Sequence, residues 1–320
     1  MPLTRKAIVE QTIACKCTER VPIWVDGVQL THSDVLTYDL SLSDSNNPKL
    51  SEWGFRRLKA ADGSWIVPKE GTLTTWPQVD AYKIPNQDFE RRFRFIPAAA
   101  RVCQDRYRLA SFGLSGYSVY CALRGAALCF DDCLRDFDRF GEFFDEILEF
   151  ETSMFDTLMR KGFHGIEFCD DWGPRKTSRI TLSLWRTLFR DRYAIQIKRA
   201  KELGLHVWFS VSEEGSEFFG DLREIGVDVV RVENPMHDEI ASIGRRLRSK
   251  LCFATRVESL YTPEDGISST NEIRNMRDTL GVLTGGFIAT IGANASQETI
   301  QGIAEIINKF PSGINSKYHS

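Results

Sequence analysis

The sequence contains no apolar run long enough to cross a bilayer and no apolar leader after its first residues. A membrane-spanning helix needs about 20 predominantly apolar residues in succession. A signal peptide would place an apolar stretch and a small-residue cleavage site soon after Met1–Lys6, and neither is there. We therefore expect a cytoplasmic protein that has no membrane partner.

The chain also lacks an excess of charge of either sign. Its 41 Lys and Arg residues face 44 Asp and Glu residues, which gives a net charge of −3. The basic residues are spread along the chain apart from short clusters such as Arg245–Arg248, a pattern typical of a solvated helix face. This balance gives no overall attraction to the phosphates of nucleic acid. We expect a small molecule, and no nucleic acid, as the partner.

Histidine is scarce, and the common phosphate and nucleophile motifs are absent. Of the five histidines, only His237 follows a predicted strand as a metal ligand would. The chain has no G-x-x-x-x-G-K-[ST] loop and no G-x-G-x-x-G after a strand. Leu114-Ser115-Gly116 lacks the G-x-S-x-G context of a serine nucleophile. These absences disfavour a histidine zinc site, a phosphate-binding loop and a serine hydrolase.

Short apolar runs are present, and they alternate with amphipathic helical stretches. This alternation is typical of βα units around a parallel sheet. Most of the runs are continuously apolar, as expected for strands that are covered on both faces. The predicted strands are Pro22–Val25, Leu109–Leu114, Gly165–Cys169, His206–Val211, Val227–Val232, Leu251–Val257 and Phe287–Ile291.

Helices with a 3.6-residue apolar period separate these strands. One predicted helix carries Phe140 to Leu158 on its apolar face and runs to about Lys161, where Gly162 can end it. A second carries Trp185 to Ala200, and the last covers about Gln297–Phe310. Units repeated at spacings of ~25–40 residues predict an α/β fold of the TIM type, a (β/α)8 barrel, over an open doubly wound sheet. We expect a single domain over residues 1–320.

Residues 31–88 do not fit this alternation. The segment is polar, contains turn pairs such as Asp62-Gly63 and Glu70-Gly71, and has room for a hairpin around Ser64–Val67. We expect an irregular N-terminal insertion near the barrel mouth, with a poorly ordered loop as the alternative.

Acidic residues follow five of the predicted strands. In a parallel α/β barrel, catalytic residues project from the carboxyl ends of the strands and the loops after them. Carboxylates brought together there repel, so they must be protonated, paired with a cation such as Arg175 or Arg256, or bound to a metal. The residues predicted to line this edge are Asp26, Ser115, Gly116, Asp170, Asp171, Trp172, Ser212, Glu213, Glu214, Glu233, Asn234, Arg256, Glu258 and Asn294.

The segment Gly165–Gly173 resembles the "DDWG" segment of the uroporphyrinogen decarboxylase superfamily. Downstream, Leu184–Tyr193 and Leu203–Pro235 are similar to the segments that follow it in that family. Upstream, Thr4–Pro22 and Trp76–Pro85 resemble the family's opening segments, so the resemblance covers most of the chain in the family's order. It implies a barrel fold and either a decarboxylase or a methyltransferase that serves a corrinoid protein.

The chain departs from both branches of that family. The arginine-rich segment of the tetrapyrrole decarboxylase is missing after Val25, and an acidic barrel mouth would repel a polycarboxylate substrate. The methyltransferases' zinc ligands correspond to Ser210, Ser212 and Ala293, none of which is a good zinc ligand. The resemblance is closest to O-demethylase-like "DDWG" members, in which acidic residues could hold a metal. Such a site would use Glu213, Glu233 and Glu258.

Three functions follow as hypotheses. The first is a one-carbon (methyl) transferase resembling corrinoid-linked O-demethylases, in which Asp171 positions the substrate and Glu213 and Glu258 bind a divalent metal such as zinc or exchange protons. The second is a decarboxylase, a lyase of a small acid, in which Arg256 or Arg175 holds the carboxylate. The third is a binding barrel without catalytic activity. The predicted substrate contacts are Asp26, Asp170, Trp172, Arg175, Ser212, Asn234 and Asn294.

The resemblance also bears on cofactors and assembly. A corrinoid would reach the first kind of site only on a partner protein, and the identity of any further cofactor is open. The resemblance to that family makes a homodimer the expected assembly.

Overall fold

The computed structural model describes residues 2–27, 32–59, 65–66, 68–94, 104–172, 180–211, 213–233, 237–261, 266–281, 283 and 285–309. The chain divides into two compact units. Unit 1 combines Met1–Leu36 with Asn234–Ser320, and unit 2 is Thr37–Glu233. None of the helices in the described part of the chain combines the length and the apolar character that crossing a lipid bilayer requires.

Unit 1 contains three strands in its described part, and they pair in parallel. β1 (Ile23–Val25) pairs with β10 (Phe287–Ile291), and β10 pairs with β9 (Cys252–Arg256). The helices of this unit are α1 (Arg5–Ile13), α12 (His237–Leu247), α13 (Gly266–Leu280) and α14 (Gln297–Ile307), with the short 3-10 helix η2 at Glu258–Leu260.

Unit 2 contains four strands that pair in parallel in chain order. They are β5 (Tyr107–Ser111), β6 (Gly165–Cys169), β7 (His206–Val211) and β8 (Val229–Val232). β2 (Val35–Asp39), most of which belongs to this unit, follows β5 in the strand order. The helices are α2 (Trp76–Asp80), α3 (Phe89–Phe93), α5 (Gly116–Arg124), α6 (Ala126–Arg135), α7 (Phe137–Thr152), α8 (Phe155–Arg160), α9 (Leu182–Leu188), α10 (Arg190–Glu202), η1 (Glu213–Phe218) and α11 (Phe219–Glu224).

The eight-stranded parallel sheet with helices between its strands is a TIM-type (β/α)8 barrel, which confirms the predicted fold class. The bounds of β6, β7 and β10 are those predicted from the apolar runs. β5 ends earlier than predicted, at Ser111, because the chain turns directly after it. Gly113 has φ +73°, and the Leu114 N–H bonds the Phe112 carbonyl at 2.8 Å. A glycine accepts this left-handed conformation without strain.

The long helix predicted up to Lys161 is two helices, α7 and α8. Near the break, side chains compete for the carbonyls that would continue the helix. The Thr152 hydroxyl bonds the Leu148 carbonyl at 2.7 Å, and the Ser153 hydroxyl bonds the Phe150 carbonyl at 2.6 Å. Such local side-chain bonds offer the backbone an alternative to the helical ladder. Gly162, with φ +74°, then ends the second helix as expected.

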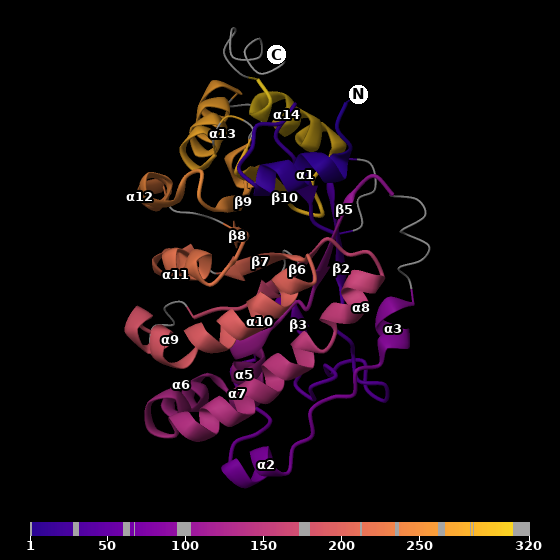
Figure 1. Cartoon of the computed structure of the whole chain (residues 1–320), viewed down its shortest axis with the longest axis vertical. Coiled ribbons are helices and arrows are strands. Elements are labelled where there is room, and N and C mark those ends of the chain that lie inside the picture. Colours follow the sequence, from indigo (N-terminus) through magenta and orange to yellow (C-terminus); the bar gives the residue numbers. More distant parts are fainter. Residues whose placement is uncertain are drawn as a thin grey trace. The chain divides into compact units, whose positions relative to one another are not determined.

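The apolar faces predicted for these helices are buried. Phe140 and Phe144 of α7 are 0% exposed, and so is Phe189, at the start of α10. The Phe189 ring meets each of the other two rings edge to face at a centroid separation of 5.4 Å. α7 and α10 run side by side in Figure 1, so this aromatic cluster joins them. The cluster thus fixes α7, which carries the buried carboxyl group of Glu151, against α10.

Part of the predicted insertion forms regular structure. β2 lies within residues 31–88 and was not among the predicted strands. β3 (Leu58–Lys59) and β4 (Trp65–Ile66) pair antiparallel, as the expected hairpin would. Between β2 and β3, two isolated antiparallel bridges, Ser43 to Ser51 and Leu50 to Arg56, shape residues 40–57. We call this stretch the 40–57 segment.

Candidate functional site

A row of polar side chains shares one face of the unit 2 strands at their carboxyl ends. Ser111 of β5 pairs with Glu167 of β6. Two residues further along β6, Cys169 pairs with Ser210 of β7, which pairs with Arg231 of β8. Register partners on neighbouring strands, and residues two apart on one strand, point to the same face. This row therefore lies where barrels of this class carry their active sites.

Two carboxylates hold the Arg231 guanidinium. Glu167 is 2% exposed, and its Oε1 lies 3.5 Å from Arg231 Nη1. Glu233, directly after β8, places its Oε1 2.5 Å from Arg231 Nε. A carboxylate within an apolar strand is costly to bury unless a cation pairs with it. The expected repulsion between carboxylates is thus relieved by an arginine that lies inside a strand rather than after one.

Cys169 adds a neutral thiol to the same face. Its Sγ lies 3.6 Å from the Ser111 hydroxyl. Burial raises the pKa of the Cys169 thiol well above its ordinary value, and the Glu167 carboxylate raises it further. Because the thiolate is the form that attacks carbon or binds metal, we expect Cys169 to act as polar lining and not as a nucleophile.

Asp170, a predicted substrate contact, is 2% exposed and caps α5. Its Oδ2 accepts the Tyr117 backbone N–H at 2.8 Å, its Oδ1 accepts the Ser118 N–H at 2.7 Å, and the Tyr193 hydroxyl donates to Oδ2. Gly116 has φ +48°, and a Cβ there would lie 2.5 Å from Oδ2. The carboxylate thus satisfies N–H groups at the helix start that no helical carbonyl reaches. A contact of Asp170 with substrate stays a prediction.

The two residues after Asp170 differ in their surroundings. Asp171 is half-buried, and its backbone N–H donates to the Ser118 hydroxyl at 3.1 Å. Trp172 is 2% exposed and lies in the aromatic core of unit 2, so Asp171 is the more accessible of the two predicted contacts. The rings around Trp172 are Trp185, Tyr193, Phe209 and Phe218, with centroids 5.1 to 5.5 Å away.

Glu151 of α7 is a second buried carboxyl group in this region. Its Oε1 accepts the Gly116 N–H at 2.8 Å, and its Oε2 accepts the Gln196 side-chain amide at 2.8 Å. Burial raises the pKa of Glu151 to about 8, against the lowering effect of these two hydrogen bonds, and the Asp170 carboxylate adds to the rise. Sequence analysis did not single out Glu151, because it lies on a helix face with apolar neighbours.

We expect the substitution Glu151→Gln to remove a pH dependence of stability. The folded-state pKa of about 8 lies above the ordinary value of 4.5. The unfolded chain therefore loses this proton first as the pH rises, and the free energy of unfolding falls between those two values. The glutamine cannot titrate, so its stability relative to the wild type should rise by up to about 5 kcal/mol across that window. Urea unfolding at both ends of the window measures the change.

Glu149→Gln is the matched control for this prediction, because Glu149 is an exposed carboxylate on the same helix. Its stability should follow the wild-type pH profile. Parallel profiles for the wild type and Glu151→Gln would show that Glu151 is ionised in the folded protein like an exposed carboxylate.

The described site residues of unit 1 gather around Arg256, the last residue of β9. Its Nη2 lies 3.0 Å from Asp26 Oδ2, and its Nη1 lies 3.9 Å from Glu258 Oε2. Glu258 Oε2 also accepts the Gly292 N–H at 2.7 Å. The structure thus brings Asp26, Arg256 and Glu258 together, while Asn294 is exposed in the turn after β10. The guanidinium is balanced by two carboxylates here, as it is around Arg231.

The remaining predicted residues are only partly placed. Arg175, Ser212 and Asn234 lie outside the described residues, and of Glu213 only the backbone, in η1, is described. Among the described residues, no three His, Cys, Asp or Glu side chains gather closely enough to hold a metal ion. Glu233 and Glu258, two of the predicted ligands, are engaged by arginine or by a backbone N–H. Because the side chain of Glu213 lies outside the described residues, a metal bound through Glu213, Glu233 and Glu258 stays a prediction.

A hollow in unit 2 lies at the carboxyl end of β5. The centre of a water molecule can move within about 20 Å³ of it, so the hollow has room for about one water molecule. No sequence motif marks the hollow, because its walls are ordinary apolar residues. They are Leu42, Trp53 and Phe55 of the 40–57 segment and Phe112 and Leu114 after β5.

Fold and strand-end geometry place the chain among the TIM-type barrels. No protein-family model matches the sequence, and no curated protein matches it. Among solved structures, it is similar to a methyltransferase from Methanosarcina mazei, with a TM-score of 0.70 and 11% identity, covering 95% of this chain and 98% of that chain. A chitinase from Chromobacterium violaceum ATCC 12472 has a TM-score of 0.43 and 10% identity, covering 91% of this chain and 100% of that chain. At these identities the likeness is one of fold.

Proposed function

We propose that this chain is a methyltransferase that acts on a small molecule at the carboxyl ends of the unit 2 strands. The proposal depends above all on the likeness to the methyltransferase from Methanosarcina mazei, which extends over nearly the full length of both chains. The sequence resemblance to the methyltransferases of the uroporphyrinogen decarboxylase superfamily supports the same class. The polar row on β5 to β8 gives this barrel a place to bind a substrate.

In this proposal Arg231 stabilises the leaving group. Methyl transfer forms a bond from the acceptor's electron pair to the methyl carbon, while the bond from that carbon to its heteroatom breaks and leaves a pair on the heteroatom. A guanidinium fixed by Glu167 and Glu233 can donate hydrogen bonds to that atom as its charge develops. Asp171 and Glu213, which follow β6 and β7, are proposed as further substrate contacts. A corrinoid on a partner protein, as the resemblance implies, is the proposed acceptor.

The ion pairs of Arg231 and Arg256 favour methyl transfer over decarboxylation. A decarboxylase of a small acid needs a cation whose charge is left for the substrate carboxylate. Arg231 lies between Glu167 and Glu233, and Arg256 lies between Asp26 and Glu258. Each of these guanidiniums is therefore already paired with two carboxylates. A substrate carboxylate would bring a full third negative charge close to them, whereas the leaving atom in methyl transfer carries only part of a charge in the transition state and needs only a hydrogen-bond donor.

The substitution Arg231→Lys tests the proposal. A lysine ammonium cannot make the planar, forked contacts of a guanidinium, so we expect kcat for methyl transfer to fall by about 100-fold with little change in KM. The assay offers the protein a panel of methyl ethers, thioethers and methylamines with a free reduced corrinoid as acceptor. Mass spectrometry then follows the demethylated product.

Arg135→Lys is the control, because this arginine is exposed on α6, with its side chain 76% accessible, and should leave kcat unchanged. If no member of the panel is demethylated, the proposed methyl transfer is wrong. If Arg231→Lys retains the wild-type kcat, the role given to Arg231 is wrong.

A further inference from the structure

The corner between α5 and α6 brings two cysteines together. Gly125 turns the chain between the two helices with φ +85°, a conformation that a glycine accepts without strain. Its N–H bonds the Cys121 carbonyl at 2.8 Å, and its carbonyl accepts the Cys129 N–H at 3.0 Å. The two cysteines therefore lie one helical turn before and one helical turn after the same glycine.

The side chains of these two cysteines meet across the corner. The Cys121 and Cys129 Sγ atoms are 2.6 Å apart, which lies between the length of a disulfide bond, about 2.0 Å, and an ordinary non-bonded contact, about 3.5–4.0 Å. Both residues are 2% exposed, and both are thiols in the structure. Because α5 and α6 already pack against each other, joining the two sulfurs needs only a small shift of the side chains.

A third thiol, Cys133, is buried in α6 but is not placed to join Cys129. It lies four residues after Cys129 on the same helix. Side chains at that spacing stand about 5–6 Å apart at their Cβ atoms, whereas a disulfide needs about 3.5–4.5 Å. The geometry therefore favours the pairing of Cys121 with Cys129.

Tyr117 favours the reactive form of one of the two thiols. Its hydroxyl donates to the Cys129 Sγ at 3.5 Å. A hydrogen bond to sulfur stabilises the thiolate more than the thiol, because the thiolate carries the charge. The thiolate is the form that a peroxide oxidises. Cys129 is therefore the thiol that reacts first, and Cys121 is the thiol that attacks its oxidised sulfur.

We propose that Cys121 and Cys129 form a reversible disulfide when a peroxide oxidises the protein. The Cys129 thiolate attacks one oxygen of hydrogen peroxide, the O–O bond breaks, and the departing hydroxide leaves as water with the thiol proton. The Cys121 sulfur then attacks the resulting sulfenic acid, the S–O bond breaks, and a second water leaves with the Cys121 proton. Two thiols are thus oxidised while one peroxide is reduced to two water molecules. This disulfide does not depend on the proposed methyl transfer.

Peptide mapping of the full-length protein tests the disulfide. Trypsin separates Cys121, in peptide 109–124, from Cys129, in peptide 125–135. After treatment with hydrogen peroxide and alkylation of the remaining thiols, we expect mass spectrometry to find these two peptides joined, and dithiothreitol should separate them again. The absence of the joined peptide, whether the thiols are alkylated or have become sulfinic acids, would overturn the proposal.

Three variants identify the pair and the order of the steps. Cys133→Ala is the matched control, since this thiol is equally buried at 2% exposure and its loss should leave the joined peptide in place. Cys121→Ala should abolish the joined peptide in a variant whose circular dichroism matches the wild type. Tyr117→Phe should slow its formation about fivefold, because the hydrogen bond to the Cys129 sulfur is lost. Loss of the joined peptide in Cys133→Ala would contradict the pairing, and an unchanged rate in Tyr117→Phe would contradict the role given to Tyr117.

Discussion

Replacing Arg92 with methionine is expected to lower the free energy of unfolding by about 3–5 kcal/mol. The Arg92 side chain is 0% exposed and forms an ion pair with Glu52, whose side chain is 10% exposed. It also donates to the Leu40 and Gln87 carbonyls and lies over the Phe150 ring, 5.2 Å from its centroid. Methionine fills similar volume, but it leaves the Glu52 carboxylate with the Leu42 N–H and without its cation, and it leaves the Leu40 and Gln87 carbonyls without the arginine donor. The expected loss of stability comes from the buried Glu52 carboxylate that no longer has a cation beside it, rather than from lost packing.

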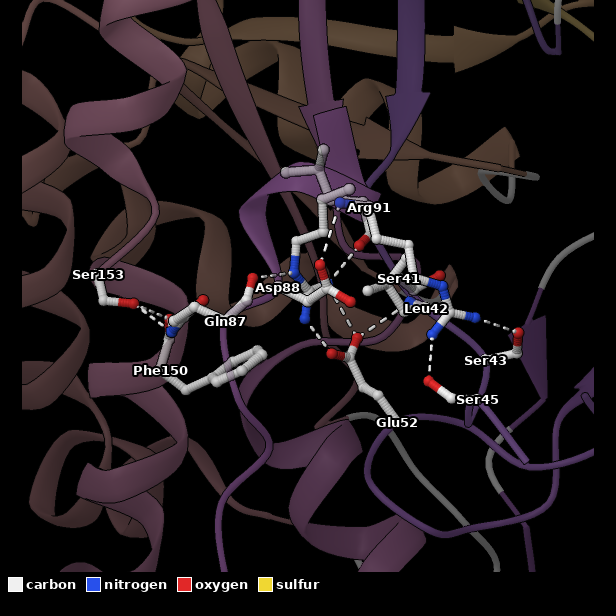
Figure 2. Close-up of polar contacts among 12 residues, drawn as sticks. Ser41, Leu42, Ser43, Ser45, Glu52, Gln87, Asp88, Arg91, Phe150 and Ser153 are labelled. Atoms are coloured by element: carbon white, nitrogen blue, oxygen red, sulfur yellow. Dashed lines mark hydrogen bonds and ion pairs between the residues drawn. The ribbon is translucent and has the colours of Figure 1, made fainter. Parts of the chain in front are cut away.

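The neighbouring Arg91 provides the control. It donates to the Ser45 and Ser43 hydroxyls at 2.9 and 3.2 Å, at the edge of the 40–57 segment (Figure 2). Arg91→Met removes two partly solvated bonds and should cost about 1 kcal/mol or less. The midpoint and slope of urea unfolding measure both variants.

A double variant separates the two causes of the Arg92 effect. If the stranded carboxylate is the cost, Arg92→Met with Glu52→Leu should regain much of the lost stability, since replacing both members of a buried pair by apolar groups is often neutral. A loss below about 1 kcal/mol in Arg92→Met would contradict the buried-pair interpretation. A double variant less stable than Arg92→Met would contradict it as well.

The strands that the sequence predicted correctly share one property. Gly165–Cys169, His206–Val211 and Phe287–Ile291 are predominantly apolar runs, and burial on both faces of a barrel strand favours such runs. β2 does not have this property. Its residues Val35 and Leu36 are buried, but the strand continues through half-buried residues to the exposed Asp39. A strand of this kind inside a polar segment cannot be distinguished from a loop by its apolar pattern.

The candidate site was only partly visible in the sequence for a related reason. The sequence predicts a site made of residues that follow the strands, whereas Glu167 and Arg231 lie inside β6 and β8. A signal was available, because each is a single charged residue within an otherwise apolar run. Such a residue must find a partner in the interior. Which charges meet depends on strand register, and the sequence alone does not fix the register.

Asp170 is the opposite case. The sequence predicts its position after a strand, but it does not predict which groups donate hydrogen bonds to its carboxylate. Besides the N–H of the next residue, its donors are Tyr117 and Ser118, which precede it by about fifty positions, and Tyr193 on α10. The two aspartates of the "DDWG"-like segment therefore have different roles. Asp170 anchors the start of α5, and Asp171 is left half-buried at the end of β6.

Asp170→Ala should accordingly lower the free energy of unfolding by roughly 3 kcal/mol at neutral pH, because it leaves two buried N–H groups and a buried hydroxyl without an acceptor. Burial raises the pKa of Asp170 from 3.8 to about 6 against the hydrogen bonds that lower it. The carboxyl group therefore contributes most to stability below its ordinary pKa and loses part of that contribution as the pH rises to about 6. The cost of Asp170→Ala should thus be larger near pH 4 than at pH 7.

Urea unfolding of three variants at both pH values tests this assignment. Tyr193→Phe removes one of the four groups that donate to the Asp170 carboxylate and should cost about 1 kcal/mol, a fraction of the Asp170→Ala effect. Asp191→Ala removes an exposed carboxylate from the first turn of α10 and should cost about 0.5 kcal/mol at most. An Asp170→Ala loss no larger than that of Asp191→Ala would mean that the N–H groups of α5 find other acceptors. In that case Asp170 would be available for the substrate, as the sequence first indicated.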